Sequence, residues 1–379
     1  MKILVNTASS FKGGGIQTSK SFIEECINFL GNEYFVVLSK NLAKTINIGN
    51  FPDNFTFYIA PFRPATKVFS FRSHNYFLKE IEKKFNPDIV FSVGGPSYWR
   101  PKSIHLMGYT IPHYIYPESH YFKIIPLKRK LWWKAMKIYA RYVFKRDADA
   151  LVVQTDDVNV RVKELLGKSK VYTVYNTINA HYLKYDTFNN KLAEKRSDEF
   201  RLLILSAWYP HKNLSIIPEV VKLLNNSGHN NIKFIVTLPD TDFNKLDINS
   251  EIDSIINVGP VRIEEAPSLY NECDAMLLPT LLECFSASYV ESMKMGKPIL
   301  TSDMGFARTV CNNAAIYFDP MDAKDITAKI IELFNSKELQ KKLIENGTKR
   351  LDIFGSAEER AKRYHEICET LLNQQTSNL

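Results

Sequence analysis

Two carboxylates in the C-terminal half of the chain are spaced so that they could act together. Glu283 lies in a predicted loop after a strand, and Glu291 follows inside a helix expected over 287–295. Each carboxylate can accept hydrogen bonds from sugar or ribose hydroxyls. The alternative is that both are surface charges on a helix, which is the commoner place for glutamate.

The start of that helix offers backbone donors beside the two carboxylates. Ser286 is the expected N-cap, because serine oxygens accept hydrogen bonds from the first turn of a helix. The unpaired amides of a first turn, together with the helix dipole, favour anionic or hydroxyl oxygens. The amides that could hold such a ligand are those of Phe285, Ser286 and Ala287.

Two further features point to an anionic ligand. Lys212 follows the strand predicted over 201–206, so it stands at the carboxyl edge of the second sheet, where ligands bind. Gly13, Gly14 and Gly15 stand between the first strand and the first helix, so the backbone there can turn tightly and approach an oxyanion. The alternatives are a solvated lysine and a flexible turn, and the glycines match neither common phosphate-loop motif.

These residues must be positioned by alternating strands and helices. Apolar runs typical of buried parallel strands recur at 2–6, 34–38, 55–60, 88–93, 103–107, 150–154 and 170–175, then at 201–206, 232–238, 275–279, 298–302 and 314–318. Helical patterns lie at 16–30, 74–86, 156–166, 214–226, 264–272, 287–295, 322–335 and 356–373. The fold class is therefore α/β with two doubly wound parallel sheets, and ligands bind at the carboxyl ends of such strands.

The predicted domains are 1–184 with the C-terminal helix from about 356 to 379, and 200–355, joined by a hinge at 185–199. Five scattered cysteines, no signal peptide and no apolar run of spanning length favour a cytoplasmic location, with at most peripheral contact at the inner face of a membrane.

The segment from Glu283 to Glu291 resembles the E-x7-E signature of retaining glycosyltransferases of family 4, whose two Rossmann-like domains form the GT-B fold. The resemblance is dense from about 200 to 332 and looser before. Other segments similar to that family are SAWYPHKN (206–213), VGPV (258–261), LLPT (277–280), TSD (301–303) and AAIYFDP (314–320).

The resemblance implies that Glu283 contacts the transferred sugar, that the amides of 285–287 face sugar and diphosphate, and that Glu291 binds the ribose. It also implies that Lys212 binds the donor diphosphate. Members usually carry an arginine where this chain has Ala207. Losing one charged hydrogen bond weakens a site by roughly ten- to a hundredfold.

Candidate substitutes for that arginine are His211 and Arg262, and Ser286 stands where the family has a glycine. A histidine of the first domain commonly lies near the sugar in this family. His113, in the loop after 103–107, is the candidate, ahead of His105 inside that strand; the alternative is a structural or exposed histidine.

No metal and no cofactor are expected. Asp147 with Asp149, and Asp240 with Asp242, each spell D-x-D, a divalent-ion pair in the other large glycosyltransferase fold. Because the strand connectivity predicts two parallel sheets, we interpret all four aspartates as loop or boundary residues.

The first 180 residues carry 26 basic and 13 acidic side chains, and the rest of the chain carries 23 and 28. Nine basic residues and no acidic one lie between Tyr121 and Arg146. Lys130, Lys134, Lys137, Arg141 and Lys145 form one stripe on a helix, with apolar side chains, Trp132, Ile138 and Tyr142 among them, on its other faces. We expect contact with an anionic membrane surface; the alternative is a solvated stripe, and no nucleic acid is expected.

The sequence therefore predicts a metal-independent, hexosyltransferase-like retaining enzyme that moves a sugar from a nucleotide diphosphate sugar to a hydroxyl of a glycan or lipid-linked acceptor, in surface polysaccharide synthesis. The alternatives are a catalytically silent nucleotide-sugar-binding module and a nucleotide-sugar epimerase on the same fold.

Overall fold

The computed structural model describes residues 1–67, 75–183, 190–246 and 253–376. The chain divides into two compact units. Unit 1 comprises Met1–Ile115, Leu127–Thr177 and Ser356–Leu379, and unit 2 comprises Tyr116–Pro126 and Ile178–Gly355. Residue 74 of one predicted helix, the predicted domain end at 184 and residues 185–189 of the predicted hinge lie outside the described residues.

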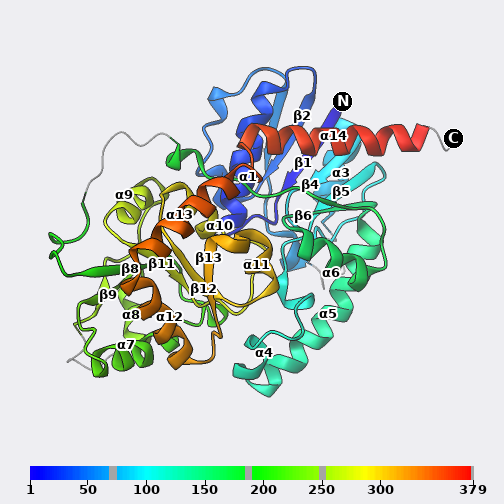
Figure 1. Ribbon diagram of the computed structural model, residues 1–379. Helices are drawn as coiled ribbons and strands as arrows, with labels where there is room; N and C mark the ends of the chain where they lie inside the picture. The colour runs from blue at the N-terminus through cyan, green and yellow to red at the C-terminus, as the bar shows by residue number, and fades with distance from the viewer. Residues whose placement is uncertain (68–74, 184–189, 247–252, 377–379) are drawn as a thin grey trace. The chain divides into compact units, whose positions relative to one another are not determined.

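Unit 1 contains a parallel sheet in the order β3-β2-β1-β4-β5-β6-β7 (Figure 1). Its strands are β1 (Lys2–Thr7), β2 (Glu33–Leu38), β3 (Phe55–Ile59), β4 (Ile89–Ser92), β5 (Ile104–Gly108), β6 (Ala150–Val153) and β7 (Val171–Thr173). Every residue of β1 and β2 after the first is buried, as expected where helices cover both faces of a sheet. The strand order reverses between β1 and β4, which makes this sheet doubly wound.

The helices of unit 1 are α1 (Gly14–Glu25), α2 (Lys40–Ala43), α3 (Tyr76–Phe85), α5 (Leu127–Asp147), α6 (Asp156–Leu166) and α14 (Ala357–Thr376), with 3-10 turns at Cys26–Asn28, Ile48–Asn50, Pro64–Lys67 and Pro112–Tyr114. The helix predicted over 156–166 is confirmed. It begins behind Thr155, whose hydroxyl accepts from the Val158 amide, and it ends at Gly167 with φ of 60°.

Helix α14 completes the hydrophobic core of unit 1. Its buried residues Ala361, Tyr364, Cys368 and Leu371 pack in the same cluster as side chains of β1, β2 and β4. The His365 ring lies 2.7 Å from the Tyr34 hydroxyl oxygen, as a hydrogen-bonded pair. Sequence-distant segments at the two ends of the described chain therefore share one core.

Unit 2 contains a second parallel sheet in the order β10-β9-β8-β11-β12-β13. Its strands are β8 (Phe200–Ile204), β9 (Ile232–Val236), β10 (Ile255–Asn257), β11 (Ala275–Leu278), β12 (Ile299–Ser302) and β13 (Ala315–Phe318). Its helices are α4 (Tyr121–Ile124), α7 (Ile217–Asn226), α8 (Asp240–Phe243), α9 (Ala266–Asn271), α10 (Ala287–Lys294), α11 (Gly305–Cys311), α12 (Ala323–Asn335) and α13 (Lys337–Leu351). The 3-10 turns are Ala180–Tyr182, Pro210–Lys212, Leu214–Ile216, Asn244–Leu246, Ile263–Glu265 and Asn312–Ala314.

Five of the strands and α-helices of unit 2 are absent from the predicted set: α4, α8, β10, α11 and α13. Strand β10 has three residues, too few for a periodic pattern. Helix α13 is polar and buries only Leu343 and Gly347, so its apolar stripe is hard to recognise. Gly347 allows close packing, since a β-carbon there would lie 3.2 Å from Met293 of α10.

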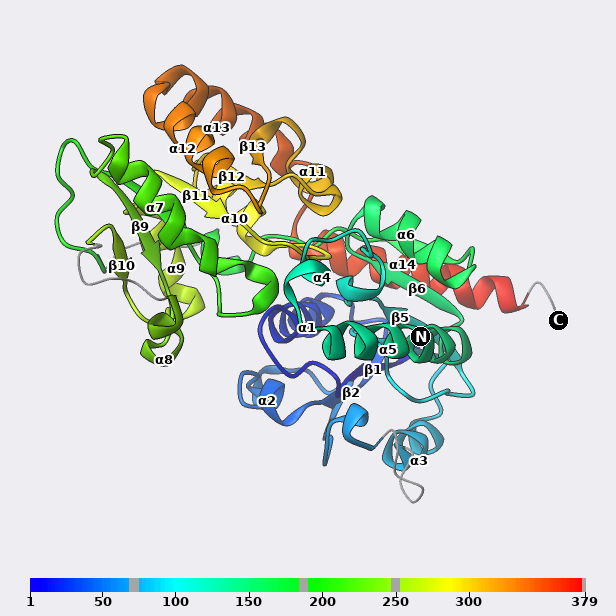
Figure 2. The same ribbon diagram turned by 90° about the horizontal axis from the view of Figure 1, so that it is seen from below.

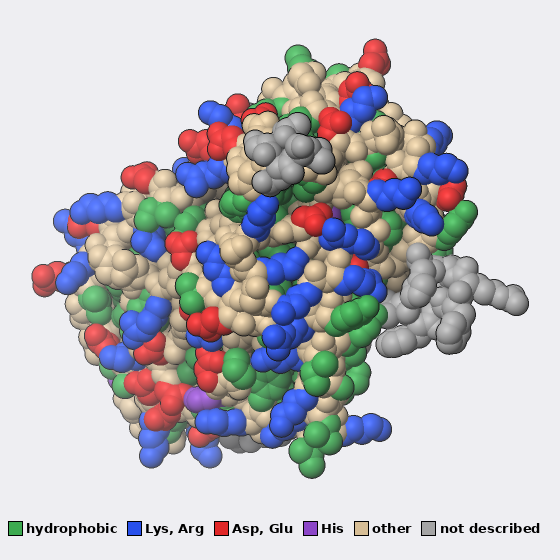
Figure 3. Space-filling model, turned by 90° about the vertical axis from the view of Figure 1, so that its right-hand side faces the viewer, with side chains coloured by type: hydrophobic (Ala, Val, Ile, Leu, Met, Phe, Trp, Pro, Cys, Tyr) green, Lys and Arg blue, Asp and Glu red, His purple; other side chains and the backbone are tan. Residues whose placement is uncertain are grey.

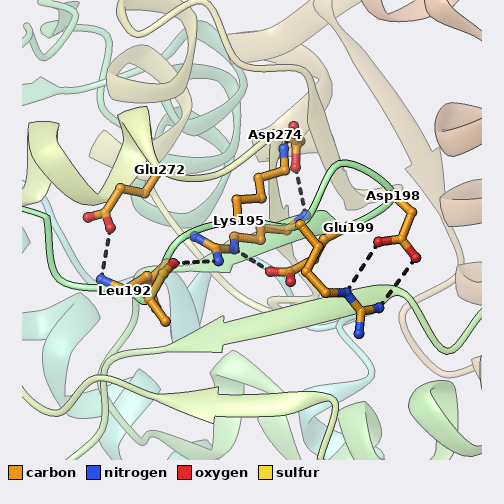
Figure 4. A network of polar contacts seen from close by, with 9 residues as sticks. Leu192, Lys195, Asp198, Glu199, Glu272 and Asp274 are labelled. Carbon is orange, nitrogen blue, oxygen red and sulfur yellow. Dashed lines mark hydrogen bonds and ion pairs between the residues drawn. The ribbon is translucent and has the colours of Figure 1, made fainter.

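The described part of the predicted hinge is bonded to unit 2 (Figure 4). The Leu192 amide donates to Glu272 at 2.8 Å, and Lys195 forms an ion pair with Asp274 at 2.5 Å. Asp274 also accepts from the Arg201 amide at 2.7 Å. Residues 191–195 are therefore tied to the rest of unit 2 by the carboxylates of Glu272 and Asp274, just before β11.

No helix among the described residues is long and apolar enough to cross a membrane. The five cysteines are buried, and none of them forms a disulfide.

Candidate functional site

The point where the strand order of the second sheet reverses brings together two of the predicted site residues. Lys212 ends the turn after β8, and Glu283 lies between β11 and α10, so both stand at the carboxyl ends of adjacent strands. Lys212 Nζ and Glu283 Oε1 form an ion pair. The two side chains keep only 16% and 14% of their accessible surface. A cation and a carboxylate thus share a recessed position at the sheet edge.

Backbone hydrogen bonds hold the two loops that carry this pair. The Leu281 amide donates to the His211 carbonyl at 2.7 Å. Thr280 Oγ1 lies 3.1 Å from the same carbonyl and 3.2 Å from Glu283 Oε1, so its single proton can serve either oxygen. The positions of Lys212 and Glu283 are therefore fixed by the fold.

A segment that the sequence did not connect with the site also reaches these loops. Ser119 Oγ donates to the Leu281 carbonyl at 2.6 Å, within unit 2. The Tyr116 ring lies edge-on to Phe306 of α11, with 5.7 Å between centroids. Residues 116–126, predicted in the first domain, group with unit 2 for this reason. No pattern in the sequence indicates this pairing across 162 positions.

Neither candidate substitute for the missing arginine supplies a spare cation. Burial, and secondarily the charge of Lys212, lower the pKa of His211 to about 4, so this histidine is neutral at pH 7. Its ring stacks on Tyr209, with 5.5 Å between centroids. Arg262 is exposed and pairs with Glu264 and Glu265. Burial of His211 therefore disfavours the charged form that a replacement cation requires, and Arg262 is engaged by Glu264 and Glu265.

Helix α10 begins where the sequence predicts, with Ser286 at the N-cap. Ser286 has φ of −106° and ψ of 119°, an extended conformation open to any residue. Replacing the family's glycine by serine therefore causes no backbone strain. The serine side chain makes no capping hydrogen bond, so the first-turn amides at 285–287 are not occupied by it.

Glu291 occupies a buried position in α10 and faces two tyrosines of unit 2. Burial raises the pKa of Glu291 to about 7, and interaction with the hydroxyls of Tyr182 and Tyr270 partly offsets the rise. The two tyrosine rings meet at 71°, with 5.9 Å between centroids. Tyr182 was missed in the sequence because it lies outside every predicted element.

The remaining predicted residues lie in unit 1. Gly13 caps α1 with φ of 52°, and a β-carbon on Gly13, Gly14 or Gly15 would meet no atom within 4 Å. The glycine turn is thus open, as an oxyanion loop requires. His113 stacks on Trp133 of α5, with 3.9 Å between centroids and 10° between ring planes.

His105 has a structural environment inside β5. Its ring nitrogens lie 2.8 Å from Ser92 Oγ and 2.7 Å from the Asp147 carbonyl, and burial lowers its pKa to about 4. Both ring nitrogens of His105 are therefore engaged inside unit 1.

Three of the four aspartates in the two D-x-D segments form ion pairs. Asp147 is buried and pairs with Arg146, and Asp149 pairs with Arg100 at 2.7 Å. Asp242 pairs with Lys245 at 2.5 Å. Within the described ranges, no group of three or more His, Cys, Asp or Glu side chains could hold a metal ion.

Residues 186–350, which include Lys212, Glu283 and Glu291, match the family model described as glycosyl transferases group 1. The O-antigen chain mannosyltransferase RfbU of Salmonella typhimurium is 24% identical over 50% of this chain and 52% of its own length. The capsular polysaccharide biosynthesis glycosyltransferase CapM of Staphylococcus aureus is 23% identical over 58% of this chain and 62% of its own. The chain thus spans a little over half the length of these curated relatives.

Solved structures resemble the whole chain. A glycosyltransferase from Rickettsia africae superposes with a TM-score of 0.70 at 17% identity, covering 98% of both chains. HepE of Anabaena, solved with UDP and glucose, has a TM-score of 0.69 at 12% identity, over 98% of this chain and 100% of its own. At such identities the likeness concerns the fold, and it confirms the predicted fold class of two Rossmann-like parallel-sheet domains, as in GT-B glycosyltransferases.

Proposed function

We propose that this protein is a retaining, metal-independent glycosyltransferase that moves a sugar from a nucleotide diphosphate donor to a hydroxyl of a glycan or lipid-linked acceptor. The observation that carries the proposal is the Lys212–Glu283 pair at the reversal point of the second sheet, within the segment that matches glycosyl transferases group 1. In the overall reaction, the bond from the anomeric carbon to the diphosphate breaks, a bond to the acceptor oxygen forms, and the acceptor proton is released.

Each residue of the site has a proposed part in that reaction. Lys212 leaves Glu283 and binds the diphosphate, whose negative charge grows as the glycosidic bond breaks, so it stabilises the transition state more than the ground state. Glu283, freed from the lysine, accepts hydrogen bonds from the sugar. The amides of 285–287 bind phosphate or sugar oxygens, and Glu291 receives the ribose.

The class of donor is supported by one structural neighbour, HepE, which was solved with UDP and glucose. The two curated relatives act in O-antigen and capsular polysaccharide synthesis by their names. We accordingly propose surface polysaccharide synthesis as the setting. The bound base and sugar are to be identified by calorimetry with UDP-sugars and GDP-sugars.

The proposal is tested by turnover of single variants in a nucleotide-release assay against a panel of donors and acceptors. Lys212→Ala and Glu283→Ala should each lower turnover by roughly tenfold or more, from the loss of one charged contact. Lys329→Ala is the matched control, since Lys329 forms an ion pair with Glu332 on α12 of the same unit. Rates that stay equal to wild type in both site variants would exclude the proposed site.

A silent nucleotide-sugar-binding module is the second candidate, and the shortage of cations favours it. Ala207 provides none, His211 is neutral, and Arg262 is paired with glutamates. Calorimetry separates the two candidates: a module binds the donor but releases no nucleotide with any acceptor, whereas the transferase does both.

A further inference from the structure

Helix α5 of unit 1 presents most of its length to solvent. It has 21 residues, and only Ala140, Val143, Phe144 and Asp147 are buried. The buried residues all lie from Ala140 onward, where α5 packs beside α6. Figure 2 shows α5 in teal within unit 1. Trp132, Ile138 and Tyr142 are exposed, so the alternative of a helix whose only exposed stripe is the charged one does not describe α5.

Four of the exposed apolar side chains form a row along α5. Leu127, Leu131, Ile138 and Tyr142 keep 70%, 57%, 74% and 58% of their surface exposed. Their spacings of four, seven and four residues place them on one side of an α-helix. A row of this kind on the outside of a folded unit indicates an interaction surface, because isolated exposed apolar residues would show no such spacing.

Cations border this apolar row on both sides. At 100° per residue, Lys130, Lys134, Lys137 and Arg141 follow one border, with Lys145 at its end, while Lys128 and Arg146 lie on the other. The single acidic residue of α5, Asp147, is buried and paired with Arg146. Figure 3 shows Lys and Arg side chains beside exposed hydrophobic ones on the side of the molecule where α5 lies in Figure 1.

We propose that this face of α5 docks on an anionic lipid bilayer, with Leu127, Leu131, Ile138 and Tyr142 entering the interface and the flanking lysines and arginines at the phosphate level. An apolar row flanked by cations is the pattern of helices that lie in the membrane interface. The inference does not depend on the Lys212–Glu283 site and would hold for the silent module as well.

The charges on α5 argue against two other partners for this face, a second copy of the chain and a nucleic acid. A second copy docked through the same face would bring two sets of these cations together without an acidic partner. A nucleic acid would use the cations but leave the leucine and isoleucine side chains facing water, because phosphate contacts carry most of its affinity. Only a bilayer with anionic headgroups above an apolar interior matches both the flanking cations and the apolar row of α5.

The experiment is co-sedimentation of the full chain with vesicles of phosphatidylcholine alone and of phosphatidylcholine with phosphatidylglycerol. We expect binding to the anionic vesicles at 0.1 M salt, weaker binding at 0.5 M, and little binding to the neutral vesicles. Absence of binding to the anionic vesicles at low salt, or equal binding to both compositions, overturns the proposal.

The charge variant is Lys130→Gln, Lys134→Gln and Arg141→Gln together, which should lower the partition coefficient on the order of a hundredfold. Its control removes the same charge from exposed positions of α3, by changing Lys79, Lys83 and Lys84 to Gln. Equal losses in the two variants would show a general charge effect and overturn the assignment to α5.

The apolar variant, Leu131→Ser with Ile138→Ser, should also reduce vesicle binding, by about tenfold or more, from the loss of buried apolar area. Leu30→Ser with Ile48→Ser, exposed residues of the same unit, is the control. Circular dichroism melting checks that each variant is folded. Full vesicle binding by the apolar variant, or preference for an RNA competitor over vesicles, counts against the proposal.

Discussion

The ion pair between Lys212 and Glu283 sets the charge that an incoming ligand meets. In the described state the lysine is held by a carboxylate, with Thr280 beside the same oxygen. A diphosphate that binds Lys212 must displace Glu283 and tolerate its negative charge nearby. In the proposed reaction, Glu283 by itself therefore opposes nucleotide binding and contributes only when a sugar is attached.

This view predicts opposite changes in binding and turnover for Glu283→Gln. The neutral amide removes the charge that competes with phosphate, so UDP or GDP should bind several-fold tighter, while sugar transfer falls roughly tenfold or more. Calorimetry and the release assay measure the two quantities, and Lys212→Ala should weaken both. Weaker nucleotide binding in Glu283→Gln would mean that the glutamate merely supports the loop.

The buried carboxyl of Glu291 predicts a pH dependence of stability. Its pKa is 4.5 when unfolded and about 7 when folded, so the folded state binds the proton more tightly. The free energy of unfolding therefore decreases as the pH rises from about 4.5 to about 7 and is level above. Glu291→Gln should abolish this part of the decrease, giving up to about 3 kcal/mol of relative stabilisation at pH 8.

Urea unfolding of wild type and Glu291→Gln at pH 4.5, 6 and 8 measures that difference. Glu345→Gln, at an exposed position of α13, is the control and should show no pH-dependent difference. A difference between Glu291→Gln and wild type that is constant with pH would contradict the raised pKa.

At the level of elements, the packing of α13 on α10 controls where the site helix lies. Gly347 leaves no room for a side chain against Met293, so Gly347→Val should push α10 and lower stability by about 1–3 kcal/mol. Because the first-turn amides of α10 are the proposed phosphate donors, nucleotide affinity should fall as well. Thr348→Val, at the exposed neighbouring position, measures the effect of the low helix propensity of valine alone. Equal losses of stability in the two variants would contradict the role of packing between α13 and α10.

The strands and the positions of Lys212 and Glu283 could be predicted from the sequence. Buried parallel strands are continuous apolar runs, and their carboxyl ends share one edge of the sheet. The predicted runs at 34–38 and 232–238 correspond to β2 and β9. Lys212 and Glu283 follow neighbouring strands, which is why the sequence places them together.

The features that could not be predicted from the sequence depend on contacts with residues far away in the chain. Ile138 and Val143 are both β-branched residues of α5, yet one is exposed and the other buried, according to what packs against each. The Ser119 contact with the Leu281 carbonyl depends on how a remote segment folds over the loop. The pKa of Glu291 depends on Tyr182, which no pattern connects with α10.

At the scale of the whole molecule, unit 1 depends on α14, although that helix follows unit 2 in the chain. Tyr364 packs against Phe22 and Phe91, with centroids 5.2 Å and 5.0 Å apart. Tyr364→Ala should cost about 3–5 kcal/mol in unit 1. Hydrogen exchange by mass spectrometry should show faster exchange in β1, β2 and β4 with little change in β8 and β11, and an equal increase in both sheets would argue against separate cores.

The same arrangement sets an order for folding during synthesis. Domains usually fold in the order in which they leave the ribosome, the N-terminal one first. Here the first sheet emerges early but lacks Ala361, Tyr364, Cys368 and Leu371 until the residues of unit 2 have been translated. Unit 2 has a core of its own, so we expect it to become native first. Until α14 is made, the N-terminal half should keep apolar surface exposed, where chaperones can bind it.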